Sequence, residues 1–243
     1  MKKKVQIIKY ERPAKSEIKS DMLAEEIGIG VYLNDIKITE LMCSPAFLDE
    51  LAVGYLFSFD LIGRNTEFVI NTGPCQKAVK ITVPEGAARD NYNLGQAKIG
   101  NEKIINIDEA LSIMKQLQVK SDLFRETGAV HTYALKLPAG LIFREDVGRT
   151  NALYKLIGFC VINRCSPEKA VLFTSSRISA GIVAKANKLG APVIVSRGAP
   201  TSLAVELAQE MGIAVLGFAR GERVNVYSRP ERIEINNFNG SWK

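Results

Sequence analysis

The stretch from residue 170 to residue 220 reads AVLFTSSRISAGIVAKANKLGAPVIVSRGAPTSLAVELAQEMGIAVLGFAR and decides the fold class. Short apolar runs alternate in it with longer runs whose apolar residues recur at helical spacing. Regular alternation of strand and helix is typical of an α/β layer with a mostly parallel sheet. The predicted strands are Ala170–Thr174, Pro192–Val195 and Ile213–Phe218, and the predicted helices are Ser179–Leu189 and Ser202–Met211.

Upstream of this stretch the pattern changes. A helix is predicted at Asn151–Val161, a hairpin at Thr132–Leu137 and Leu141–Phe143, and a helix capped by Asp108 that runs to Lys120. The first hundred residues are β-rich, with strands predicted at Val5–Tyr10 and Ala78–Val83. A hairpin is predicted at Ile29–Leu33 and Ile36–Met42, with its turn at Asn34-Asp35. One helix is predicted to begin at Ser44 and Pro45. The stretch 84–103 shows no periodic pattern of apolar residues, which predicts a mobile loop. We therefore expect a β-rich N-terminal part, 1–103, and an α/β domain, 104–243.

Composition narrows the class of protein. A formal net charge of +6 favours anionic ligands but is too small to indicate nucleic-acid binding by itself. No apolar run is long enough to cross a membrane and no signal peptide is visible, which predicts a cytoplasmic protein. The four cysteines, at 43, 75, 160 and 165, match no zinc spacing, and the chain has a single histidine. We expect reduced thiols and no bound metal.

Polar clusters follow two of the predicted strands, where open α/β sheets bind ligands. The first contains Ser176 and Arg177, and the second contains Ser196 and Thr201. Hydroxyls, exposed amides and a guanidinium at such a place can hold an anion. Simple helix capping by the serine and threonine side chains is the alternative interpretation of each cluster.

Two further clusters extend the candidate site. The residues from the end of the last predicted strand onward combine a ring for stacking, permissive backbone and two charges for phosphates, which suits a purine nucleotide. They are Phe218, Ala219, Arg220, Gly221, Glu222 and Arg223. A basic hairpin loop is the alternative there. Asp146 and Arg149 lie at a predicted helix start, where they can bond a pterin or sugar edge or cap the helix.

Taken as an ordered set, several strings resemble the FdhD family over about residues 26–233. The strings are CSPAFLDELAVGYLFSFDLI, TGAVHTYAL, EDVGRTNALYKLIG, SSRIS and SRGAPTSLAVELAQEMGIAVLGFARGERVNVYSRPERI. The resemblance places the family's cofactor-binding stretch on residues 218–223, the same segment chosen above for nucleotide contacts. The resemblance also adds His131 to the candidate cofactor-binding residues, although a lone histidine is usually structural.

The resemblance implies a cytoplasmic homodimer that serves formate dehydrogenase. Such proteins take sulfur from a cysteine desulfurase as a cysteine persulfide and pass it to the bis-molybdopterin guanine dinucleotide cofactor. A persulfide carrier is chemically sensible, because a thiolate of low pKa can accept and give sulfane sulfur. The resemblance further implies a C-terminal three-layer α/β domain like the cytidine deaminase fold without zinc.

One departure from the family matters for the chemistry. The family's C-G-x-C-G motif corresponds here to Asn93–Gly100, which contains no cysteine, and Thr150 stands where the family has histidine. Cys75 is the first substitute as a persulfide site, and Cys43, before a predicted helix, is the second. Two other accounts remain open: the chain carries the cofactor without transferring sulfur, or another protein docked on it hands the sulfur over.

Overall fold

The computed structural model describes residues 1–13, 15–73, 77–84, 102–165 and 167–236. Its centre is a six-stranded sheet in the order β13-β12-β11-β10-β8-β9. The strands are β8 (His131–Leu137), β9 (Gly140–Asp146), β10 (Val171–Thr174), β11 (Val193–Ser196), β12 (Ala214–Arg220) and β13 (Arg223–Ser228).

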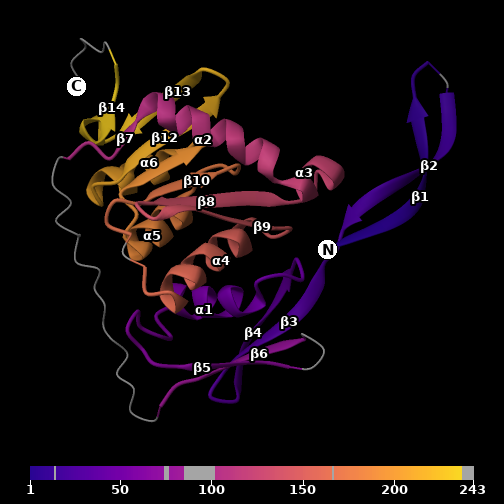
Figure 1. Cartoon of the computed structure of the whole chain (residues 1–243), viewed down its shortest axis with the longest axis horizontal. Coiled ribbons are helices and arrows are strands. Elements are labelled where there is room, and N and C mark those ends of the chain that lie inside the picture. The colour runs from indigo at the N-terminus through magenta and orange to yellow at the C-terminus, as the bar shows by residue number, and fades with distance from the viewer. Residues whose placement is uncertain (14, 74–76, 85–101, 166, 237–243) are drawn as a thin grey trace.

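Helices cover both faces of this sheet, so the C-terminal part has three layers (Figure 1). Successive strand residues point to opposite faces. Leu172 and Ile194 therefore join a core with α4 (Arg149–Ile162), α5 (Ala180–Leu189) and α6 (Ser202–Glu210). Val171 and Val193 join the other core, with α2 (Ile107–Lys120). The α/β prediction is confirmed.

The predicted parallel pairing is only partly right. β10, β11 and β12 are parallel, whereas β8, β9 and β13 pair antiparallel with their neighbours. The cause is connection length: tight turns join β8 to β9 and β12 to β13, and a tight turn forces antiparallel pairing. The strands joined by helices are the parallel ones.

The N-terminal part forms a second, four-stranded sheet in the order β4-β3-β6-β5. Its strands are β3 (Ile27–Leu33), β4 (Ile36–Cys43), β5 (Val69–Thr72) and β6 (Ala78–Thr82). The predicted turn between β3 and β4 is confirmed, since Asn34 and Asp35 both have positive φ, as a two-residue type I′ hairpin turn needs.

Helix α1 (Leu48–Ser58) joins the two parts by packing against α4. The two helices meet at glycines. A β-carbon on Gly54 would lie 1.8 Å from the carbonyl oxygen of Tyr154, and one on Gly158 would lie 1.8 Å from that of Glu50. The backbones are therefore in direct contact, and one core runs from β3 and α1 through α4 to the large sheet.

Before β3 the chain forms a long antiparallel hairpin, β1 (Lys2–Glu11) and β2 (Lys15–Ala24), which projects from the body (Figure 1). The sequence pattern predicted only part of its first strand. The remaining short elements are α3 (Asp122–Thr127), the paired strands β7 (Ile105–Asn106) and β14 (Ile233–Glu234), and a 3-10 turn at Pro230–Arg232.

Two predicted helix starts are wrong. Helix α1 begins at Leu48 rather than at Pro45, because Ser44 binds the end of β9: its amide donates to Asp146 and its hydroxyl accepts from the amide of Val147. Helix α2 is capped by Asn106, whose side chain accepts from the amide of Asp108 at 2.8 Å.

Part of the domain prediction cannot be compared with the structure. Most of the predicted loop 84–103 lies outside the described residues, and the boundary at 103/104 stays a prediction, as does the likeness to the cytidine deaminase fold. None of the helices in the described ranges is long and apolar enough to cross a membrane.

Candidate functional site

At the carboxyl edge of the parallel strands, the loops after β10 and β11 stack on each other and on the last part of β12. The backbone oxygen of Thr174, at the end of β10, accepts from the amide of Arg197 at 3.1 Å. One strand further, the oxygen of Gly198 accepts from the amide of Phe218 at 3.0 Å. The loops that follow β10 and β11 and the last part of β12 are thus fixed to one another by backbone hydrogen bonds.

Close backbone contact holds these loops together. A β-carbon on Gly198 would approach the backbone of Arg177 to 2.9 Å, and one on Gly217 would approach the ring Cδ of Pro200 to 2.9 Å and the backbone oxygen of Gly198 to 3.1 Å. Since real β-carbons do not come so close, only glycine allows this stacking. The backbone at this edge is therefore closely packed and rigid.

A hydroxyl network lies at the end of β10. The Ser176 hydroxyl is 2.9 Å from the Tyr133 hydroxyl and 2.9 Å from that of Thr174. Burial raises the pKa of Tyr133, so the phenol stays protonated and can donate. Ser176 is not a helix cap, and the Ser179 side chain makes no capping hydrogen bond either. The capping interpretation is wrong for the first cluster.

In the second cluster, one residue caps a helix as the alternative interpretation predicted, and the other does not. Ser196 donates to the backbone oxygen of Ser176 and accepts from the amide of Gly198, so it ties the loops together. Thr201 does cap α6, since its hydroxyl accepts from the amide of Ala204 at 3.3 Å. Thr201 is exposed as well, and its predicted part in cofactor binding stays a prediction.

Arginines surround the rigid edge. Arg177 follows β10 and is exposed, while Arg220, at the end of β12, donates from Nε to the backbone oxygen of Arg197 at 2.8 Å. Arg149 begins α4 and is also exposed. Three exposed guanidinium groups along one edge form a basic surface suited to phosphate or carboxylate groups.

His131 lies at the same edge, because β8 runs antiparallel to β10 and begins where β10 ends. Burial lowers the pKa of His131 below its usual value, and the charge of Arg149 lowers it further. The imidazole is therefore neutral at pH 7. Its pKa is sensitive to the charge of Arg149 and therefore to charge that enters the site beside that arginine.

The segment 218–223 forms the far end of the edge. Phe218 has φ 54°, a left-handed conformation unusual for a bulky residue, within an irregular stretch of the β12–β13 pairing. Ala219, Gly221 and Glu222 line a groove of about 820 Å³ that is completed by α2. Arg220 and Arg223 are exposed beside it. The predicted nucleotide segment thus borders a real cavity.

Like Ser196, the predicted cofactor residue Asp146 has no exposed surface. Its side chain is fully buried and forms an ion pair of 2.5 Å with the fully buried Lys155. Its oxygens also accept from the amide of Gly148 at 2.7 Å and from Asn151 Nδ2 at 3.2 Å. The structure shows a role in anchoring the start of α4, and a direct contact with a ligand stays a prediction.

The cysteines differ in how deeply they are buried. Cys43 ends β4, is fully buried, and has its pKa raised to about 12 by burial and by the charge of Asp146. Cys43, the second candidate for the persulfide site, is therefore neither exposed nor lowered in pKa, and the structure contradicts its choice. Burial also raises the pKa of Cys160. Cys165 is partly exposed, and Cys75 lies outside the described residues.

Sequence reasoning missed two members of this edge. Tyr133 looks like a core residue, because it alternates with apolar neighbours in β8, and only the fold shows that its hydroxyl reaches Ser176. Arg197 was passed over because its role lies in its backbone groups. In the described ranges no group of three or more histidine, cysteine, aspartate or glutamate side chains is arranged to hold a metal ion.

The fold and this edge define a class: an α/β protein with a rigid, basic edge suited to an anionic ligand. Comparison with known proteins narrows it. The family model described as FdhD/NarQ matches residues 63–234, and the chain belongs to that family.

Individual relatives agree over nearly the whole chain. A protein of Bacillus pumilus named sulfur carrier protein FdhD is 33% identical, over 95% of this chain and 97% of its own. The Bacillus subtilis protein of the same name is also 33% identical, over 93% and 95%. A solved structure from Desulfotalea psychrophila, described as that of a candidate formate dehydrogenase accessory protein, superposes with TM-score 0.82 at 28% identity, over 96% and 99%.

Proposed function

We propose that this chain is an accessory protein of formate dehydrogenase that binds the bis-molybdopterin guanine dinucleotide cofactor at the carboxyl edge of its large sheet. It works in the cytoplasm as a homodimer and receives sulfur from a cysteine desulfurase. The relatives named as FdhD sulfur carriers support the family role. The residues at the edge support the choice of ligand.

The convergence of arginines on one rigid edge carries the proposal. Phe218 on β12 and His131 on β8 are separated by two strands, which corresponds to about 14 Å along the edge. Arg177 and Arg220, both exposed, lie between or beside them. That length and charge fit the guanine and diphosphate of a dinucleotide, with the ring of Phe218 available for stacking.

The residues at hand fit the cofactor's anionic part. When bound, the cofactor would supply its molybdenum centre as the acceptor of the transferred sulfur. The chain's own contribution is to hold the phosphates with arginines, to donate from Ser176, and to exclude water from the buried Tyr133 side of the site.

GDP is the probe for this site, and we expect it to bind more tightly than ADP by about tenfold or more, since base edges are discriminated by hydrogen bonds. Arg177→Gln should weaken GDP binding about tenfold through loss of a charge-assisted hydrogen bond. Arg125→Gln is the control, because Arg125 is an exposed arginine paired with Asp122 on α3. Calorimetry measures both variants.

His131 gives a second readout of the same binding, because it is the chain's only histidine and is resolved alone by NMR. Phosphates near Arg149 should raise the pKa of His131 from its lowered value. By linkage, GDP should then bind more tightly as pH falls through the titration of His131. GDP that leaves the histidine titration unchanged, or that binds Arg177→Gln as tightly as wild type, contradicts the proposed site.

Sulfur transfer needs a thiol, and burial restricts the choice. The step moves one sulfane sulfur from the desulfurase persulfide to a thiolate and leaves a thiolate behind, so no oxidant is required. The raised pKa values of Cys43 and Cys160 make both poor acceptors. Cys75 remains our proposed carrier.

After incubation with a cysteine desulfurase and cysteine, mass spectrometry should show a gain of one sulfur atom that is lost in Cys75→Ala and kept in Cys43→Ala. An adduct on Cys165 would move the carrier site there. If no adduct forms while GDP still binds, the chain is a non-catalytic carrier of the cofactor, which is the second candidate function.

A further inference from the structure

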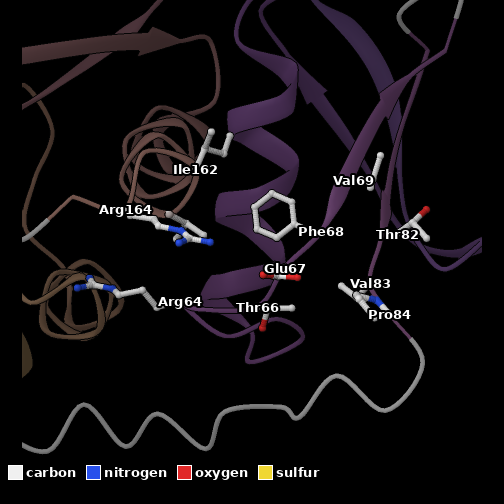
Figure 2. Close-up of a pocket in the computed structure, with 11 residues that line it drawn as sticks. Arg64, Thr66, Glu67, Phe68, Val69, Thr82, Val83, Pro84, Ile162 and Arg164 are labelled. Carbon is white, nitrogen blue, oxygen red and sulfur yellow. The ribbon is translucent and has the colours of Figure 1, made fainter.

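A second cavity lies away from the basic edge, between the C-terminal end of α4 and the strands β5 and β6 (Figure 2). Its volume is about 590 Å³, within the range of small-molecule sites. Figure 2 shows Arg64 and Arg164 on one side, Val83 and Pro84 on the opposite side, and the Phe68 ring between them. Cationic and apolar groups therefore face the same space.

Arg164 reaches this cavity from an unfavourable backbone position. It has φ 50°, just after the last turn of α4. The amide of Cys165 donates to the oxygen of Cys160 at 2.9 Å, and that of Arg164 donates to the oxygen of Val161 at 3.3 Å, a pattern that usually ends in glycine. An arginine held at a glycine position is strained, and such strain is common at functional sites.

The charge of Arg164 is also free to bind. Among the residues that the structure describes, none forms a hydrogen bond or ion pair with its guanidinium, and the side chain is exposed. Arg64 is positioned differently, because its Nη2 donates to the backbone oxygen of Leu189 at 2.6 Å. That bond fixes one guanidinium at the cavity while leaving its other N–H groups to bind a ligand.

The lining determines the class of ligand. Arg64 and Arg164 contribute two positive charges and Glu67 one negative charge, so the lining carries a net charge of +1. Phe68, Val83 and Ile162 provide an apolar surface beside these charges. A single anionic group on an apolar body matches both features, whereas a dianionic phosphate would be repelled by Glu67.

We propose that this cavity is a second binding site, for a small monocarboxylate with an apolar body, whose carboxylate is held by Arg64 and Arg164. The site is separate from the nucleotide edge and does not depend on the proposed function. An exposed, unpaired arginine in a strained conformation and a matching apolar wall are explained together by such a ligand.

The probe is 2-naphthoate, measured by ligand-observed NMR and fluorescence titration on the full chain. We expect saturable binding, with naphthalene-2-carboxamide, its neutral analogue, at least tenfold weaker. Arg164→Asn is the test variant, because asparagine also accepts a left-handed conformation but carries no charge. It should weaken 2-naphthoate at least tenfold and leave GDP binding at the sheet edge unchanged.

The variant Arg164→Gly tests the backbone strain at this position separately from the binding of 2-naphthoate. Glycine fits φ 50° without cost, so the variant should melt about 2–4 °C higher than wild type while losing the probe. Equal binding of carboxylate and amide, unchanged binding in Arg164→Asn, or no saturable binding to wild type would overturn the proposal. Weaker GDP binding in Arg177→Gln with naphthoate binding retained would confirm that the two sites are independent.

Discussion

Replacing Gly54 by alanine should destabilise the protein by about 3–5 kcal/mol, at the upper end of what overpacking costs. The added β-carbon would lie 1.8 Å from the carbonyl oxygen of Tyr154. A backbone oxygen cannot rotate away as a side chain can, so α1 and α4 must move apart. That movement opens gaps along a fully buried helix contact, and urea unfolding followed by circular dichroism measures the loss.

The second glycine of this contact makes the prediction sharper. Gly158→Ala alone should cost about as much as Gly54→Ala, because its β-carbon meets the oxygen of Glu50 at the same distance. The double variant should cost much less than the sum, since one separation of the helices relieves both clashes. Full additivity would mean that the two glycines do not share one contact.

Gly181→Ala is the matched control, because Gly181 also lies in a helix, α5, with its nearest neighbouring atom 4.0 Å from an added β-carbon. Alanine is a better helix former than glycine, so this variant should be more stable than wild type by about 0.5–1 kcal/mol. The same substitution is thus expected to have opposite signs at two helical sites. A loss below about 1 kcal/mol at Gly54 would contradict the described helix contact.

Local patterns predicted the elements of the large sheet well, because strands buried on both faces and amphipathic helices leave direct periodic signals. The alternation around β10, β11 and β12 is an example. The sequence also placed Ser176, Arg177 and Ser196 at strand ends, and the fold brings them to one edge. What periodicity cannot supply is pairing direction, which depended on the lengths of connections.

Long-range contacts explain the failures. Ser44 looks like a helix cap in the sequence, yet it binds Asp146, a residue about one hundred positions away. Gly54 and Gly158 look merely unfavourable in helices, and only their contact shows why alanine is excluded. The cavity beside Arg164 was missed for the same reason, because its walls come from segments that are far apart in the chain.

Lys155→Met should destabilise the protein by about 3 kcal/mol or more, the cost of removing one partner from a buried ion pair. Lys155 and Asp146 are both fully buried, with Nζ 2.5 Å from Oδ2. The variant leaves a buried carboxylate that still accepts hydrogen bonds from the amides of Ser44 and Gly148 and from the side chain of Asn151. Equilibrium unfolding in urea measures the difference.

Removing the other partner should cost more. Asp146→Asn leaves the ammonium of Lys155 with only two weak acceptors, the backbone oxygens of Ser44 at 3.3 Å and Glu145 at 3.4 Å. It also turns an acceptor into a donor that can face the amide of Ser44. We therefore expect a loss of about 4–5 kcal/mol, larger than that of Lys155→Met.

Lys136→Met is the control, since Lys136 pairs with Glu109 while their side chains are 30% and 43% exposed, and exposed pairs contribute less than about 1 kcal/mol. If Lys155→Met costs no more than this control, the buried pair does not anchor α4. If the predicted order holds, Asp146 stabilises the corner from which Arg149 reaches the basic edge. Asp146 then influences ligand binding through the position of that arginine, whether or not it also contacts the ligand.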